Sequence, residues 1–153
     1  MRDLHRKMWP EKCWLRTKER EKRKEIRMYI TRFTTVNNVT QDYAYHEVDD
    51  ADNHLKLFLN DDSGLYRNIC VFDDEHATVL GILPFKDGKP QKLIVHGSTV
   101  KIKPEWCSPG EEKYIFKVYN IHEQLERARI SCLNSSLTLG SCEDVDLDMI
   151  EPV

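Results

Sequence analysis

The alternation of apolar and polar residues indicates a β-rich protein whose centre lies between residues 55 and 103. The runs LKLFL (55–59) and LYRNICVF (65–72) alternate as strands do, and Asn60–Gly64 between them consists of turn-forming residues. A third run, Leu93–Ile102, is interrupted by a glycine, which is typical of a bulge or a sharp bend. The order strand, tight turn, strand, excursion and bent strand predicts the middle of a small closed barrel.

Further strands are predicted on both sides of this centre. Met28–Val36 is rich in β-branched and aromatic residues, and Asp42–Val48 resumes extended structure after two asparagines. Lys113–Tyr119 is expected to be the last strand. Between the strands, Asp49–Asn53 is expected to be a loop, and Asp73–Leu83 to contain one short helical turn. The five strands are predicted to close around four apolar residues: Leu57, Ile69, Val100 and Phe116.

A helix is expected directly after the last strand, over Asn120–Leu133. Asn120 can cap its N-terminus, and Glu123 and Arg127 stand at i,i+4 in the favourable order. Residues at helical spacing give it one apolar stripe: Ile121, Leu125, Ala128 and Cys132. The chain from Gly140 onward is predicted to be unstructured.

Length and composition predict one domain with a charged segment at each end. The chain has 153 residues, a net charge of −3 and no apolar run near the roughly 20 residues that cross a bilayer. Its first residues are charged and lack the apolar core of a signal peptide, so we expect an intracellular protein without membrane contact. We divide it into a basic N-terminal arm or helix (1–27), a small barrel with its C-terminal helix (28–133) and an acidic flexible tail (134–153).

The two ends carry opposite charge. Residues 1–27 hold 11 of the 23 lysines and arginines and 5 of the 26 acids. The cluster Lys22, Arg23 and Lys24 can contact phosphates with release of counterions, or serve in nuclear localisation. The alternative is a solvated helical face with i,i+4 ion pairs. Near the other end, VDLDMIE resembles a short docking peptide of the SUMO-interacting type.

No residues are arranged in a pattern typical of catalysis or metal binding. The chain has no G-x-S-x-G, P-loop or dinucleotide fingerprint, and its adjacent carboxylates do not converge on a substrate. We therefore expect a non-enzymatic protein with no catalytic residue, no cofactor and no small-molecule substrate. The five cysteines are odd in number, without C-x-x-C spacing, and the histidines lack metal-binding spacing, which predicts reduced thiols and no metal site.

A β-face that carries cations and aromatic rings is the clearest functional signal. Such faces stack nucleic-acid bases and follow the phosphate backbone. The alternative for Phe58 and Tyr66 is that they cover the barrel or pack on the terminal helix. The acidic residues before Leu55 favour this alternative, because they repel phosphates. The predicted nucleic-acid contacts are Lys22, Arg23, Lys24, Lys56, Phe58, Tyr66, Lys101, Lys103, Trp106, Lys117 and Tyr119.

The order of elements resembles the OB fold of replication protein A and of telomere-capping proteins. LKLFLNDDSGLYRNICVFDD is similar to a strand-turn-strand of that fold, HGSTVKIKPEWC to its fourth strand and YIFKVYN to its fifth. The resemblance covers about Met28–Leu133. It implies a nuclear subunit of a chromosome-associated complex that binds single-stranded DNA, for example a telomere-capping complex. In that group the helix after the fifth strand packs on its counterpart in a second OB subunit. The resemblance implies this partner role for Ile121, Leu125, Ala128 and Cys132.

Two other interpretations stay open. The first is an adaptor barrel that joins an assembly through Ile121–Leu133 without touching nucleic acid, which the net negative barrel favours. The second is a small virus-encoded or rapidly diverging protein that targets host proteins. The sequence does not distinguish DNA from RNA as the ligand.

Overall fold

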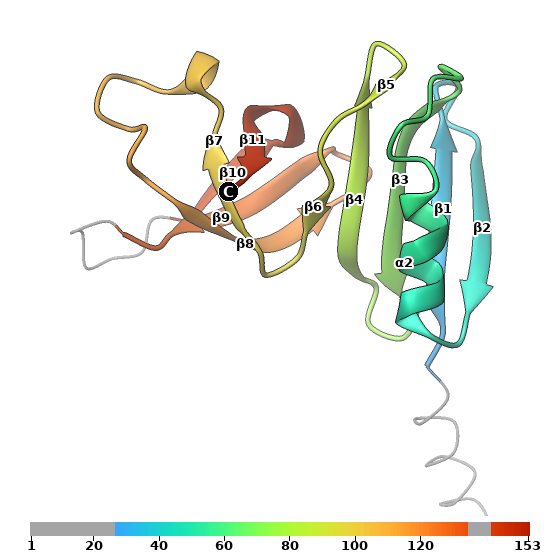
Figure 1. Cartoon of the computed structure of the whole chain (residues 1–153). Helices are drawn as coiled ribbons and strands as arrows, with labels where there is room; N and C mark the ends of the chain where they lie inside the picture. The colour runs from blue at the N-terminus through green and yellow to red at the C-terminus, as the bar shows by residue number, and fades with distance from the viewer. Residues whose placement is uncertain (1–26, 135–141) are drawn as a thin grey trace, which may run out of the picture.

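The computed structural model describes residues 27–134 and 142–153, which form two antiparallel sheets and one α-helix (Figure 1). In the first sheet the strand order is β2-β1-β3-β4-β5, and β6 also pairs with β4. In the second sheet the order is β10-β9-β8-β7-β11. The first sheet consists of β1 (Tyr29–Thr35), β2 (Thr40–Tyr45), β3 (Tyr66–Asp73), β4 (Thr78–Lys86), β5 (Lys89–Pro90) and β6 (Ile94–Val95). The second consists of β7 (Thr99–Ile102), β8 (Phe116–His122), β9 (Arg127–Cys132), β10 (Cys142–Asp146) and β11 (Ile150–Pro152).

The mainly β fold is confirmed, but the closed five-stranded barrel is wrong, because the strands form two separate sheets. The chain passes from the first sheet to the second at Gly97, between β6 and β7 (Figure 1). Gly97 has a φ of 78°, a left-handed conformation that favours glycine. The predicted bend therefore exists, and it moves the chain between sheets instead of curving one strand around a barrel.

The strand β3, in the middle of the first sheet, is buried on both faces. Cys70 and Phe72 belong to the apolar core shared with the second sheet. Their neighbours Ile69 and Val71 belong to the core under the helix α2 (Val48–Lys56). Because successive side chains of a strand point to opposite faces, a strand of this kind is apolar at nearly every position.

The helix α2 replaces the loop predicted at Asp49–Asn53, and the strand predicted at Leu55–Leu59 is wrong, because its first two residues end the helix and the rest form a turn. Ala51 and Leu55 lie one helical turn apart and are fully buried against the first sheet, whereas Leu57 is 79% exposed and lies outside the core. Asp49 and Asp50 in the first turn and Lys56 in the last turn complement the helix dipole. Asn60–Gly64 therefore joins a helix to β3 and not two strands.

The helix predicted at Asn120–Leu133 is wrong, because this segment forms β8 and β9 and the turn between them. Val118 pairs with Ile130, and Ile121 with Ala128, and all four are buried between the sheets. The structure of RARISC (127–132) therefore follows the alternation of its apolar and polar residues and not their helical spacing. The segment expected to contain one helical turn, Asp73–Leu83, instead holds most of β4.

The C-terminal residues complete the second sheet. β10 pairs with β9 and β11 pairs with β7, so residues 142–152 occupy both edges of this sheet. Val145, Leu147 and Ile150 are buried in the core shared by the two sheets. The flexible tail predicted for this part of the chain is corrected accordingly, while residues 135–141 lie outside the described residues.

A Leu147→Ala substitution tests this role of the C-terminal segment. We expect it to lower the free energy of unfolding by about 2–5 kcal/mol, since it leaves a cavity beside a core side chain. Urea denaturation followed by circular dichroism measures the change. Val153→Ala, at a residue that is 71% exposed, is the control and should change stability by less than about 0.5 kcal/mol. Equal, small effects of both substitutions would contradict the assignment.

His54 on α2 gives the fold a dependence on pH. Its ring lies among Phe33, Tyr43 and Phe58, and its Nδ1 lies 2.8 Å from the hydroxyl of Tyr45. Burial lowers the pKa of His54 below its ordinary value. The unfolded chain therefore binds the proton more readily than the folded chain does.

We expect the free energy of unfolding to decrease as the pH falls below about 6.5, the ordinary pKa of histidine, because protonation favours the unfolded state. Urea midpoints measured between pH 7.5 and about pH 5 check this dependence, which His54→Gln should reduce. His96→Gln, at an exposed turn, is the matched control. An unchanged pH profile in His54→Gln would show that other groups cause the dependence.

Candidate functional site

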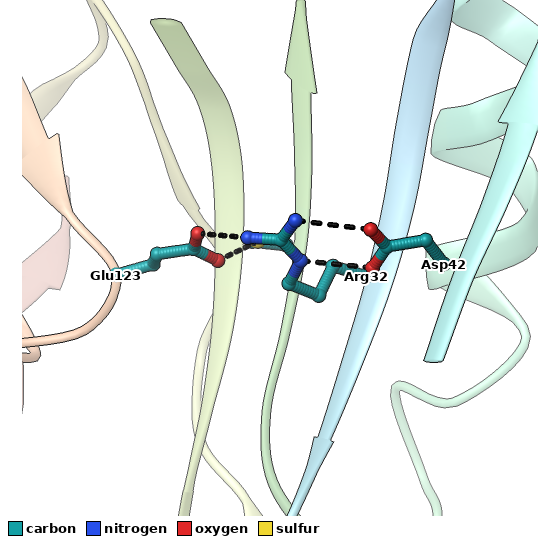
Figure 2. Close-up of polar contacts among 4 residues, drawn as sticks. Arg32, Asp42 and Glu123 are labelled. Carbon is teal, nitrogen blue, oxygen red and sulfur yellow. Dashed lines mark hydrogen bonds and ion pairs between the residues drawn. The ribbon is translucent and has the colours of Figure 1, made fainter. Parts of the chain in front are cut away.

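A polar cluster joins the two sheets where the turn between β8 and β9 meets the first sheet. The Arg32 guanidinium of β1 donates through Nη1 to Glu123 Oε1 at 2.7 Å (Figure 2). It also donates through Nε and Nη2 to the two carboxylate oxygens of Asp42 on β2, at 2.8 and 2.9 Å. The hydrogen bond to Asp42, with Glu123 nearby, raises the pKa of Arg32 further above its ordinary value. Arg32 is thus a charged link between two strands of one sheet and the turn of the other.

Cys70 on β3 takes part in the same cluster. Its thiol donates to Glu123 Oε2 at 2.7 Å, so both oxygens of Glu123 accept hydrogen bonds. Burial and the adjacent Glu123 carboxylate raise the pKa of the Cys70 thiol far above its ordinary range. Because the thiolate is the reactive form of cysteine, this environment disfavours reaction at Cys70 and favours its hydrogen bond to Glu123.

A second set of contacts lies beside the first. Arg67 on β3 forms an ion pair with Glu126, and its Nη1 donates to Asn38 Oδ1 at 2.7 Å. Asn68 is only 3% exposed and donates through Nδ2 to Glu126 Oε1 at 3.4 Å. Its Oδ1 is buried without a hydrogen-bond partner among the described residues. Glu126 has a φ of 53°, so the turn places this carboxylate against β3 through an unusual backbone conformation.

These contacts line an open polar cleft of about 360 Å³. Both arginines in it are paired with carboxylates of the turn between β8 and β9. These charges thus hold the β8–β9 turn against the first sheet. The residues that line it are Arg32, Thr34, Asn38, Thr40, Arg67, Asn68, Glu123 and Gln124.

The outer face of the second sheet carries a different arrangement, with basic side chains on adjacent strands. Alternation directs Val100, Val118 and Ile130 into the core, so the residues between them on β7, β8 and β9 face outward. Tyr119 lies at a β-bulge of β8 and is 59% exposed. We define the outer face by its exposed basic and aromatic side chains: Lys101, Lys117, Tyr119, His122, Arg127 and Arg129.

Acids on the two edge strands pair with most of these cations. Arg129 Nε lies 3.2 Å from Asp144 Oδ1 on β10, and this hydrogen bond lowers the pKa of Asp144. Lys101 Nζ lies 3.4 Å from Glu151 Oε1 on β11. Arg127 Nε lies 3.5 Å from Asp146 Oδ1 on β10. Lys117, in the middle of the sheet, forms no ion pair with any side chain in the described part of the chain.

The structure brings together three residues predicted to contact nucleic acid, and it adds residues that the sequence analysis did not select. Lys101, Lys117 and Tyr119 share the outer face. Lys103 and Trp106 follow β7, the latter in the short 3-10 helix η1 (Pro104–Trp106), where it is 53% exposed. The alternation RARISC was the available signal for the missed residues His122, Arg127 and Arg129, but it was assigned to a helix.

The other predicted contacts lie elsewhere. Lys56 lies on α2 and pairs with Asp52 at 2.7 Å. Phe58 and Tyr66 are half-buried, with ring centres 4.9 and 5.4 Å from that of Phe33, so they contribute to the core under α2. The basic cluster at residues 22–24 lies outside the described residues.

The predicted partner stripe does not exist as a surface. Ile121 and Ala128 are buried between the sheets, and Cys132 is half-buried against the same core. Leu125 is 69% exposed in the turn between β8 and β9. The four residues do not share one face, because strand pairing replaces the helix that would have aligned them.

Neither a metal centre nor a membrane-spanning segment is found in residues 27–134 and 142–153. No group of three or more His, Cys, Asp or Glu side chains within these ranges is placed to hold a metal ion. The helices in these ranges are too short or too polar to span a bilayer. The outer face and the cleft are therefore the candidate sites.

A Glu123→Ala substitution tests the cleft as a structural tie. It removes the acceptor of Arg32 and Cys70, and we expect a loss of about 2–4 kcal/mol in the free energy of unfolding, because a half-buried charge loses a partner. Asp146→Ala breaks the exposed pair with Arg127 and is the matched control, with an expected loss below about 1 kcal/mol. Thermal and urea unfolding measure both. A Glu123→Ala protein as stable as the control would refute the tie.

Comparisons with known proteins identify no relative of this chain. No family model, no curated protein and no solved structure matches it. The resemblance to OB-fold proteins therefore stays a prediction from the sequence pattern. The function has to be argued from the two candidate sites themselves.

Proposed function

We propose that this chain is a non-enzymatic module that binds single-stranded DNA along the outer face of its second sheet. The observation that carries the proposal is the gathering of cations and an exposed aromatic ring on neighbouring strands. On β9, Arg129 lies opposite the bulge at Tyr119 and Arg127 follows two residues away. Lys117 precedes Tyr119 on the same face of β8, and Lys101 lies on β7 beyond the Thr99–Lys117 pair. Grooves and faces that bind single strands combine positive charge for the phosphates with aromatic rings for the bases.

The geometry of a sheet suits this ligand. Neighbouring strands lie about 4.8 Å apart, so cations on three adjacent strands present charge across about 10 Å, a length that covers two or more phosphates. Lys117 is free of ion pairs in the described structure and lies between the paired cations on either side. Tyr119 projects from a bulge, where an extra residue turns a side chain away from the regular pleat. Lys117 thus suits a phosphate contact and Tyr119 a stacked base.

The acids at the edges do not prevent such binding. Exposed ion pairs contribute only about 0–1 kcal/mol each, so a phosphate can replace Asp144, Asp146 or Glu151 at a small cost. The exchange also makes binding selective for multiply charged strands, because a single anion would replace only one of these acids. The nuclear, chromosomal and telomeric setting stays a prediction, as does a partner subunit.

An adaptor that binds protein and not nucleic acid is the second candidate. A specific observation favours it: three exposed apolar side chains, Val36, Val39 and Leu65, adjoin at one end of the first sheet. Backbone hydrogen bonds bring them together, with Val36 N donating to Leu65 O at 3.0 Å and Thr35 N donating to Val39 O at 2.9 Å. Contiguous exposed apolar surface is typical of protein contacts.

Fluorescence anisotropy with a labelled single-stranded oligonucleotide at two salt concentrations tests the proposal. We expect affinity to fall with rising salt, since binding releases counterions. Tyr119→Ala should weaken binding by about 1–3 kcal/mol through the loss of stacking, and Lys117→Glu should both weaken it and flatten its salt dependence. Lys86→Glu, an exposed lysine at the end of β4, is the control and should bind as the parent does.

Charge reversal at Lys22, Arg23 and Lys24 in the same titration measures how much the N-terminal segment contributes to the affinity for the oligonucleotide. If only this variant loses affinity, the outer face is not the site. If the parent binds no oligonucleotide at low salt, the nucleic-acid proposal fails and the adaptor remains. An oligoribonucleotide of the same sequence tells DNA from RNA.

A further inference from the structure

A groove lies beside α2, on the face of the first sheet that the helix does not fully cover. The helix packs over β1, β2 and β3, and the surface over β4 and β6 is open next to it (Figure 1). The groove has a volume of about 340 Å³, with Val71 and Gly81 among its lining residues. Four apolar side chains that are exposed or half-buried make up much of its wall: Val48, Leu80, Leu93 and Val95.

Acidic side chains of α2 form the rest of this wall. Asp52 pairs with Lys56, which also lines the groove, at 2.7 Å. Asp49 lines the groove as well, and no side chain of the described residues forms an ion pair with it. The groove therefore fits an apolar segment that carries positive charge.

The chain enters the first sheet on the same side. Arg27 Nε lies 3.9 Å from Glu75 Oε2, in the turn between β3 and β4, and Asp74 N donates to Met28 O at 3.0 Å. The described chain thus begins beside the β3–β4 turn. This end of the sheet also holds the beginning of α2, where Val48 and Asp49 line the groove, because β2 leads into α2 from Tyr45, opposite Tyr29.

Residues 1–26 have the complementary chemistry. They include ten lysines and arginines against five acids, which gives a net charge of +5. Their bulky apolar residues gather in MWPEKCWL (8–15), which holds two of the three tryptophans of the chain. From Arg16 to Glu25 no apolar residue occurs, so this stretch can act only as a charged connection.

We propose that residues 8–15 of the same chain occupy the groove, with the rings of Trp9 and Trp14 on its apolar wall and basic residues beside Asp49. The eleven connecting residues, 16–26, span about 16 Å as a helix and up to about 36 Å when extended. The nine residues of α2 extend about 13 Å, and the distance from β1 to β4 is two strand spacings, about 10 Å. The connection is long enough in either conformation.

Acrylamide quenching of tryptophan fluorescence in the full-length chain tests this proposal. Trp106→Phe removes the third tryptophan, which is exposed, and leaves Trp9 and Trp14 as the only reporters. We expect these two to be several-fold less quenched in the Trp106→Phe protein than in the same protein carrying Val95→Arg, because the new charge closes the groove to them. Val39→Arg, an exposed valine away from the groove, is the matched control and should leave the protection intact.

A second groove variant and a series of protein concentrations complete the test. Asp49→Arg removes the acid from the wall while leaving the apolar residues, and it should also increase quenching, more so at low salt. Circular dichroism and urea midpoints confirm that each variant is folded. Quenching that is equal in Trp106→Phe and in both groove variants overturns the proposal. Protection that grows with protein concentration also overturns it, because the segment would then come from a second copy.

Discussion

The constraint that governs this structure is a sheet with apolar side chains on both faces. β3 has Ile69 and Val71 on one side and Cys70 and Phe72 on the other, and all four are buried. A sheet of this kind has to be covered twice, since each exposed apolar side chain costs about 1.5–3 kcal/mol relative to burial. The helix α2 supplies one cover and the second sheet supplies the other. The helix and the second sheet thus cover opposite sides of β3, and the strands form two sheets and not a barrel.

The polar cluster around Glu123 follows from the same constraint. Arg32 on β1 and Arg67 on β3 lie where the first sheet meets the turn between β8 and β9. Glu123 and Glu126 of this turn reach Arg32 and Arg67 on β1 and β3, where water would otherwise reach the sheet. Within this cluster, Asn68 Oδ1 is a buried acceptor that has no hydrogen-bond donor among the described residues. The residue types that suggest catalysis, a thiol beside a carboxylate, here act as a hydrogen-bonded tie.

The sequence predicts the strands whose pattern has one interpretation and misses those whose pattern has two. β1 and β3 are rich in β-branched and aromatic residues, and both were predicted nearly to the residue. The segment 120–133 satisfies both periods: Ile121, Leu125 and Ala128 fit a helix, whereas Ala128, Ile130 and Cys132 fit a strand. Its partner β10 pairs with β9 and so favours the strand over the helix. The sequence analysis did not predict β10, because it lies in an acidic segment in which only Val145 and Leu147 alternate with polar residues. Long-range pairing of this kind cannot be inferred from local preference.

Only part of the outer face could be predicted, because some of its residues lie on predicted strands and others lie on strands that the sequence analysis missed. Lys101, Lys117 and Tyr119 stand on strands that were correctly identified, so alternation alone placed them together, whereas Arg127 and Arg129 depended on β9. The acids that pair with them come from the segment interpreted as a tail, which changes the electrostatics of the face. A cation that is already paired with an intramolecular acid has to exchange that acid for a phosphate before it displaces counterions from a nucleic acid, so it adds less to binding than an unpaired cation does. In the proposed binding mode, affinity depends less on how many cations the face carries than on stacking at Tyr119 and on Lys117, which forms no ion pair within residues 27–134 and 142–153. This explains how a chain of net charge −3 could bind a polyanion, and why the strength of that binding should reside at the centre of the sheet.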